Sequence, residues 1–168
     1  GSLDDHAGVE YIFRPEGLIN QKRNVKLLCD AISEAVHKSS GDGYGLHIHV
    51  SNHFLTGSDT LKIDNFVSLF EDYFRKVGAR PETEYQVKKR INHTSDLGEF
   101  VESKYKMVNI GKCGTIEYRF PKSIVDEVHI NMNMELALAT TLFCKYELSH
   151  AKLNVYDLST SALRAFID

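Results

Sequence analysis

Two short segments in the second half of the chain, joined by a glycine-bounded turn, constrain the fold more than any other feature. Tyr105–Ile110 and Thr115–Phe120 are rich in β-branched and aromatic residues, and Gly111 and Gly114 bound the turn between them. Two such runs around a short turn are typical of an antiparallel β-hairpin. The chain is therefore expected to contain an antiparallel sheet built around this hairpin.

Other segments extend this hairpin into a mixed fold. Residue composition predicts further strands at Val9–Phe13, which Pro15 closes, and at Gly45–Ser51. Apolar residues recur at helical spacing in four segments, at about residues 21–38, 59–77, 126–150 and 159–166. Residues 79–104 are polar without a clear period, and a long functional loop or short elements are expected there. The sequence predicts an α+β domain, in which an antiparallel β-sheet has helices packed on one face and the other face open to a ligand.

Length, charge and cysteine usage bound the class of protein. The chain suits a single domain over residues 1–168, in which residues 1–2 are expected to be a cloning remnant and 122–168 a helical tail. A net charge of −3 gives no basic field for nucleic acid, and no apolar run approaches the ~20 residues of a membrane span. Three widely spaced cysteines without a CxxC pair favour reduced thiols. We expect a cytoplasmic protein without nucleic-acid or membrane partners.

Two histidines alternate along the predicted Gly45–Ser51 strand. Because residues two apart on a strand share a face, His47 and His49 point the same way, together with Ser51. Paired imidazoles suit a divalent metal ion or a phosphate, since each ring offers a neutral nitrogen or a proton. On its own, the pattern is equally consistent with two structural histidines.

Charged residues alternate with apolar ones in two other strands. Glu117 and Arg119 share a face of the Thr115–Phe120 strand, where they could form a plain salt bridge. The functional alternative is that the Glu117 carboxylate binds a metal ion and the Arg119 guanidinium clamps phosphate oxygens. Glu10 is the one acid in the Val9–Phe13 strand, which by itself is typical of a solvent-facing edge position.

Taken in this order, the segments resemble the glutamine-synthetase-like fold and, within it, the amidoligase family of carboxylate–amine ligases. Gly45–Ser51 resembles the strand that pairs a metal-binding histidine with a phosphate-contacting histidine, and Thr115–Pro121 resembles the later Glu-x-Arg-Phe-Pro strand. Glu10 resembles an earlier metal-binding glutamate. Tyr105–Ile110 is similar to the segment that leads into the Glu-x-Arg strand in amidoligases of bacteria and phages. The resemblance covers about residues 2–121.

This resemblance implies a catalytic-domain fold that holds ATP and magnesium, or manganese, on the concave face of its sheet. The implied reaction joins a carboxylate to an amine through an acyl phosphate. The implied metal ligands are Glu10, His47 and Glu117, whereas His49 and Arg119 are implied to contact phosphate and to act in catalysis. Further contacts to phosphate or carboxylate groups are implied for three basic residues, Arg80, Arg90 and Lys106. The expected partners are small-molecule or peptide carboxylates and amines.

One departure from the family keeps alternatives open. The family's first strand carries a Glu-x-Glu pair that has no counterpart before Glu10, so we expect the sheet to lack that strand. The exposed edge would then pair with a missing N-terminal segment or with a second copy of the chain. An alternative function is a non-catalytic descendant of the fold, phage-encoded, that acts as a binding or assembly domain. A two-histidine phosphoesterase is suggested by His49–Ser51, but a second His-x-Ser element is not found in a comparable predicted strand.

Overall fold

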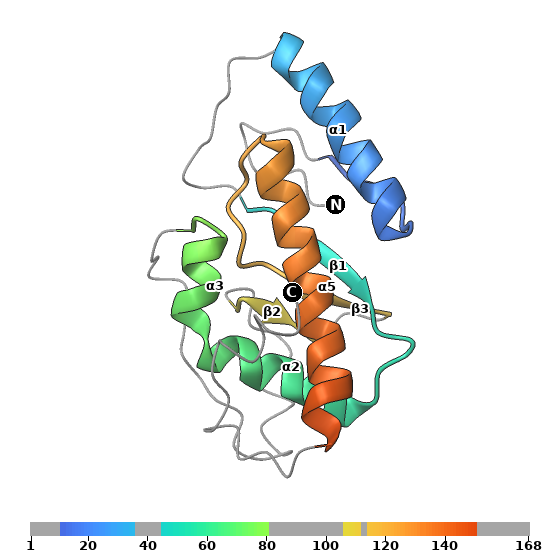
Figure 1. The fold of residues 1–168 in the computed structure, drawn as a ribbon, viewed down its shortest axis with the longest axis vertical. Helices are drawn as coiled ribbons and strands as arrows, with labels where there is room; N and C mark the ends of the chain where they lie inside the picture. Colours follow the sequence, from blue (N-terminus) through green and yellow to red (C-terminus); the bar gives the residue numbers. More distant parts are fainter. Residues whose placement is uncertain (1–10, 36–44, 81–105, 112–113, 151–168) are drawn as a thin grey trace.

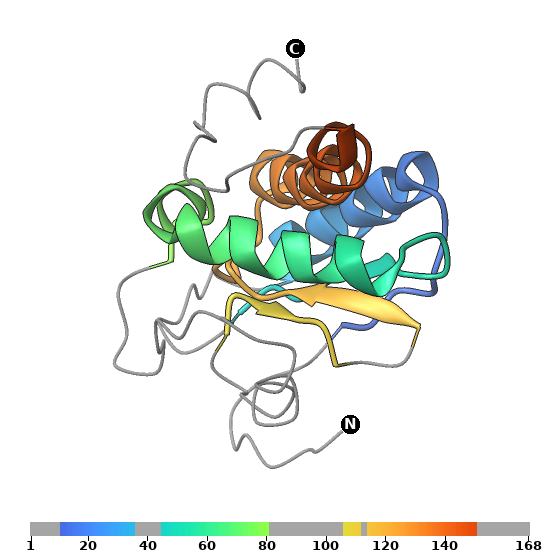
Figure 2. The ribbon, with the colours of Figure 1, turned by 90° about the horizontal axis from the view of Figure 1, so that it is seen from below.

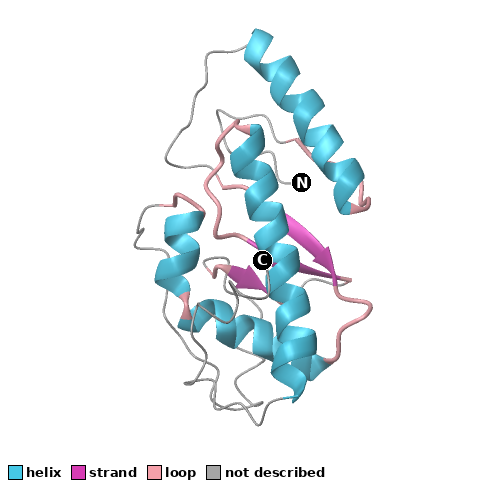
Figure 3. Ribbon diagram, in the orientation of Figure 1, coloured by secondary structure: helices cyan, strands magenta, loops and turns pink. Residues whose placement is uncertain are grey.

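The computed structural model describes residues 11–35, 45–80, 106–111 and 114–150 of the 168-residue chain. Within these ranges the fold is α+β, as the sequence predicts (Figure 1; Figure 3). The helices are α1 (Leu18–Ala35), α2 (Gly57–Leu69), α3 (Glu71–Val77) and α5 (Glu127–His150). The strands are β1 (Ile48–Ser51), β2 (Val108–Asn109) and β3 (Thr115–Tyr118).

The three strands form one antiparallel sheet in the order β1-β3-β2, so β3 is central. β2 and β3 are the predicted hairpin, and Val108 pairs with Tyr118 in it. The strand predicted over Gly45–Ser51 begins at Ile48, while Gly45 makes an isolated bridge to Lys122 beyond the end of β3. The antiparallel sheet and its hairpin are therefore confirmed, although the regular strands are shorter than predicted.

Apolar side chains on one sheet face pack beneath the helices, and Figure 2 shows α2 and α5 on the same side of the sheet. The buried core draws on the sheet and on three helices, with Ile48, Val108, Ile116, Tyr118, Phe120, Ile63, Phe66, Val67, Phe74, Phe143 and Cys144 among its members. Burying one large apolar side chain stabilises a fold by about 1.5–3 kcal/mol, so this layer fixes which face of the sheet is covered. The opposite sheet face carries the alternating polar residues.

The single helix predicted over residues 59–77 is wrong, because α2 and α3 separate at Phe70. Thr56 starts α2 with a capping box, in which its hydroxyl accepts a hydrogen bond from Asp59 N–H. The Phe70 backbone, at φ −103° and ψ 29°, leaves the helical region. The Phe66 and Phe70 rings, four residues apart, lie 4.8 Å apart between centroids, and Phe74 of α3 also reaches the core.

The strand predicted over Val9–Phe13 is wrong in its described part. Tyr11, Ile12 and Phe13 lie outside any strand and are exposed, Ile12 to 78%. Strand propensity describes how a side chain fits a pleated surface, and it does not supply the neighbouring strand on which pairing depends. The structure does not describe Val9, Glu10 or the helix predicted over residues 159–166.

The helix predicted over about residues 21–38 is present as α1. The first helix begins at Leu18, three residues before the predicted start, and Val25 is its buried anchor. None of the helices within the described ranges has the combination of length and apolar character that a membrane span requires.

Candidate functional site

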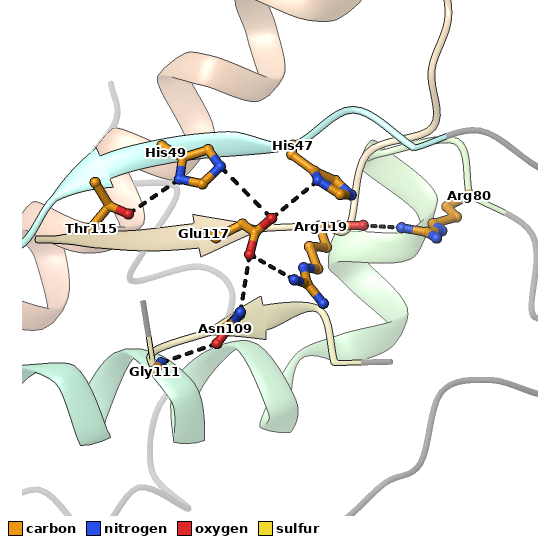
Figure 4. A network of polar contacts seen from close by, with 8 residues as sticks. All are labelled: His47, His49, Arg80, Asn109, Gly111, Thr115, Glu117 and Arg119. Atoms are coloured by element: carbon orange, nitrogen blue, oxygen red, sulfur yellow. Dashed lines mark hydrogen bonds and ion pairs between the residues drawn. The ribbon is translucent and has the colours of Figure 1, made fainter. Parts of the chain in front are cut away.

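The candidate site occupies the sheet face opposite α2 and α5, with Glu117 at its centre (Figure 4). In the strand register, Glu117 of β3 lies opposite His49 of β1 and Asn109 of β2. Side chains directly opposite one another in a sheet share a face, so these three residues form one row. His47 and Arg119 join the same face because each stands two residues from a member of the row.

The two carboxylate oxygens of Glu117 have different partners. Oε1 lies 3.1 Å from Nδ1 of His47 and 3.7 Å from Nε2 of His49. Oε2 accepts a hydrogen bond of 3.1 Å from Nδ2 of Asn109 and one of 2.7 Å from Nη2 of Arg119. Glu117 therefore holds Asn109 and Arg119 with one oxygen and presents the other oxygen to both imidazoles.

Burial and neighbouring charge shift the pKa of the Glu117 carboxyl group in opposite directions. Its side chain is 1% exposed, whereas the side chains of His47 and His49 are 46% and 40% exposed. Burial would raise the pKa of Glu117, but the hydrogen bond and charge of Arg119, with His47 and Asn109, hold that pKa below its ordinary value. Glu117 is thus a buried carboxylate at neutral pH, beneath two more exposed imidazoles.

The imidazoles have distinct surroundings. Burial lowers the pKa of His47, the Glu117 carboxylate opposes this effect, and the charges of Arg119 and Arg80 add to the lowering. A neutral His47 ring keeps one nitrogen lone pair for a ligand. Nδ1 of His49 lies 3.2 Å from Oγ1 of Thr115, and the tautomer of the ring decides which atom donates.

Arg80 reaches the same region from the turn that follows α3. Gly78 approaches Phe120 so closely that a Cβ atom on Gly78 would lie 2.5 Å from the Phe120 carbonyl oxygen. Ala79 then adopts a φ of 53°, in the left-handed region, and the chain turns toward the end of β3. From there Nη1 of Arg80 donates a hydrogen bond to the carbonyl oxygen of Arg119 (Figure 4).

The structure brings together most of the described residues that the sequence nominates. Four of them meet in one network, namely His47, His49, Glu117 and Arg119. Arg80 adjoins that network through the Arg119 carbonyl. Lys106 instead lies against α2, where its Nζ is 3.6 Å from Oδ1 of Asp64. Glu10 and Arg90 lie outside the described residues.

Sequence reasoning missed two members of the network, Asn109 and Thr115. Asn109 donates to Glu117 and accepts a 3.0 Å hydrogen bond from the Gly111 N–H, so it ties the carboxylate to the hairpin turn. Both residues stand on strands at positions that face the site. The period of two along Thr115–Tyr118, and the hairpin pairing, could have nominated them.

Across residues 11–35, 45–80, 106–111 and 114–150, no group of three or more His, Cys, Asp or Glu side chains is arranged to hold a metal ion. Two of the three predicted ligands, His47 and Glu117, do lie in contact. The third, Glu10, is not described.

Comparison with known proteins does not identify the chain. No protein-family model matches it, and neither a curated protein nor a solved structure is similar to it. The functional interpretation therefore depends on the residues and geometry of the site itself.

Proposed function

We propose that this sheet face binds the phosphates of ATP, together with magnesium or manganese, in a carboxylate–amine ligase of the glutamine-synthetase-like, amidoligase type. One observation carries the proposal: the buried Glu117 carboxylate contacts His47, His49 and Arg119 at the same time. Phosphoryl transfer depends on positioning and on positive charge around the transferred group, rather than on covalent chemistry by the protein. His47, His49 and Arg119 stand on one face of the sheet. The strands would position a phosphate there, and the Arg119 guanidinium would supply positive charge.

The donor set fits a divalent ion at His47 and Glu117. Mg²⁺ binds in octahedral geometry with bonds of about 2.0–2.1 Å, so neighbouring ligands are about 3.0 Å apart. Nδ1 of His47 and Oε1 of Glu117 are in direct contact at 3.1 Å, and the two atoms would hold such an ion in place of that contact. Arg119 and Asn109 occupy the other oxygen, Oε2, which leaves Oε1 for the ion. A bound ion would neutralise charge on the β- and γ-phosphates.

The proposed reaction has two steps. A substrate carboxylate oxygen attacks the γ-phosphorus of ATP, the bond from that phosphorus to the bridging oxygen breaks, and ADP leaves. The amine nitrogen then attacks the carbonyl carbon of the acyl phosphate, inorganic phosphate leaves, and the nitrogen loses a proton to solvent. In this scheme Arg119 and His49 donate hydrogen bonds to the transferred phosphoryl oxygens, where charge develops in the transition state.

Calorimetric titration of the 168-residue chain with Mg-ATP tests the proposal. We expect saturable binding, and a loss of affinity of about tenfold or more in Glu117→Gln and in Arg119→Lys. Glu117→Gln removes the charge while it keeps the shape, and Arg119→Lys keeps the charge while it removes the planar fork. Arg23→Lys makes the same chemical change at an exposed position of α1 and is the matched control.

Two outcomes would count against the ligase. Absence of Mg-ATP binding by the unaltered chain would favour the alternative, a binding or assembly domain that keeps the fold. Binding that is equally strong in Glu117→Gln and Arg119→Lys would place the nucleotide away from this sheet face.

A further inference from the structure

The ring of His49 lies between two side chains of β3 (Figure 4). Its Nδ1 is 3.2 Å from Oγ1 of Thr115, and its Nε2 is 3.7 Å from Oε1 of Glu117. Thr115 and Glu117 stand two residues apart on the strand, so both face the side of the sheet on which His49 lies. Each ring nitrogen therefore has a neighbour on β3, a hydroxyl for Nδ1 and a carboxylate for Nε2.

The backbone fixes the position of the Thr115 hydroxyl oxygen. Thr115 pairs with Ser51 in the strand register, and the next residue of β1, Asn52, donates a 3.1 Å hydrogen bond from its N–H to the Gly114 carbonyl oxygen. The branched side chain of threonine also restricts rotation about its first bond. The hydroxyl oxygen is thus held in place by strand pairing, whereas its hydrogen can still turn toward an acceptor.

The carboxylate of Glu117 indicates which nitrogen of His49 carries the proton. A neutral imidazole has one N–H and one nitrogen lone pair. Because Glu117 is a buried carboxylate, a lone pair on Nε2 would face a negatively charged oxygen, whereas an N–H there is attracted to it. With the proton on Nε2, Nδ1 is an acceptor, and the Thr115 hydroxyl is the donor.

We propose that Thr115 is a positioning residue, whose hydroxyl donates to Nδ1 of His49 and thereby keeps the proton of that ring on Nε2. This direction of the hydrogen bond stands on the geometry of Thr115, His49 and Glu117. Its consequence rests on the proposed function, in which His49 donates a hydrogen bond to a phosphoryl oxygen. The donor is then Nε2–H, and Thr115 acts through His49 without contacting the ligand.

Three variants separate the hydroxyl from the shape of the side chain. Thr115→Val removes the hydroxyl and keeps the branched side chain that suits a strand. Thr115→Ser keeps the hydroxyl and is the rescue variant. Thr60→Val is the matched control, because it makes the same change on α2, where the Thr60 hydroxyl donates a 3.1 Å hydrogen bond to the Thr56 carbonyl oxygen. Equal melting temperatures for Thr115→Val and the unaltered chain would confirm that the variant is folded.

The measurement is a long-range nitrogen–proton NMR correlation of the imidazole rings, in metal-free protein at mildly alkaline pH. For His49 in the unaltered chain, in Thr115→Ser and in Thr60→Val, we expect the pattern of a ring protonated on Nε2, with the Nδ1 resonance shifted upfield by the accepted hydrogen bond. In Thr115→Val the Nδ1 resonance should move downfield. A proton on Nδ1 of His49 in the unaltered chain would overturn the proposal without need of a variant, and so would an unchanged Nδ1 resonance in folded Thr115→Val.

Titration with Mg-ATP separates this inference from the proposed function. We expect affinity to fall about tenfold or more in Thr115→Val and to be retained in Thr115→Ser and Thr60→Val, because a partner that fixes the tautomer of a site histidine contributes on that scale. A Thr115-dependent Nδ1 resonance without any Mg-ATP binding would preserve the direction of the hydrogen bond and overturn the ligase. Equally strong Mg-ATP binding in Thr115→Val and the unaltered chain would preserve the ligase and overturn the positioning role of Thr115.

Discussion

Nδ1 of His47, which directly precedes β1, and Oε1 of Glu117, in the central strand β3, lie 3.1 Å apart. One partner is almost completely buried and charged, and the other is half exposed. A carboxylate below an imidazole fixes the ring and determines which of its nitrogens faces outward. The contact therefore joins the interior of the fold to the surface on which a ligand would bind.

Asn109 should position Glu117 without contacting ligand itself. Asn109→Ala removes one hydrogen bond to a buried carboxylate, so we expect the free energy of unfolding to fall by about 1.5–3 kcal/mol. Mg-ATP affinity should fall less in Asn109→Ala than in Glu117→Gln, because Arg119 still holds Oε2. Urea unfolding and calorimetry measure the two effects. An affinity loss in Asn109→Ala as large as that in Glu117→Gln would mean that Asn109 contacts the ligand.

Gly78 should be the least replaceable of the described glycines. A Cβ atom at this position would lie 2.5 Å from the Phe120 carbonyl oxygen, a backbone atom that cannot move aside as the end of a flexible side chain can. We expect Gly78→Ala to destabilise the protein by about 1–3 kcal/mol in urea unfolding. Gly57→Ala at the start of α2 should be neutral or slightly stabilising. Equal stability of the two variants would show that α3 is not held against the end of β3 as described.

Tyr118 should stabilise the core with its hydroxyl group as well as with its ring. Its OH lies 2.7 Å from Oγ1 of Thr141, which also donates to the carbonyl oxygen of Ala137. Tyr118→Phe leaves Thr141 with that second partner, so we expect a loss of about 0.5–1.5 kcal/mol in thermal or urea unfolding. Tyr146→Phe on the exposed side of α5 should have no measurable effect. If Tyr146→Phe lowered the free energy of unfolding as much as Tyr118→Phe, the stabilising role of the Tyr118–Thr141 hydrogen bond would be contradicted.

Asp64 should make stability depend on pH. Burial raises its pKa to about 6, and the charge and hydrogen bond of Lys106 only partly oppose this. Because the folded protein keeps the proton more tightly than the unfolded chain, stability is highest below the ordinary pKa of 3.8 and declines as pH rises through about 6. The difference between those values corresponds to about 3 kcal/mol.

Asp64→Asn tests this effect, because the amide does not titrate. We expect the stability of Asp64→Asn relative to the unaltered chain to increase by up to about 3 kcal/mol between pH 4 and pH 7.5. The measurement is urea unfolding at both pH values. A difference in stability that stays constant across this range would show that Asp64 titrates normally.

The sheet and the helical layer could be predicted because their signals are local. Alternation along Thr115–Phe120, a glycine-bounded turn and helical spacing in residues 126–150 each depend only on neighbouring residues. The strand predicted over Val9–Phe13 is wrong in its described part, because a strand needs a neighbouring strand to pair with, and residue propensity does not provide one. The break between α2 and α3 at Phe70 was missed because the aromatic spacing continues through it.

The site could be predicted in part for the same reason. Strand period placed His47 with His49 and Glu117 with Arg119, but the register between the two strands decides that His49 faces Glu117. The position of Arg80 depends on a close backbone approach at Gly78 and a left-handed turn at Ala79, which no periodic pattern indicates. Lys106 was nominated by resemblance alone, and its pairing with buried Asp64 is a tertiary contact.

Crystals of the chain soaked with manganese and ATP would test the central claim most directly, because manganese gives an anomalous X-ray signal. We expect an anomalous peak within bonding distance of both Nδ1 of His47 and Oε1 of Glu117, with the nucleotide phosphates directed toward Arg119. Absence of a peak at that position, or nucleotide bound on another surface, would contradict it.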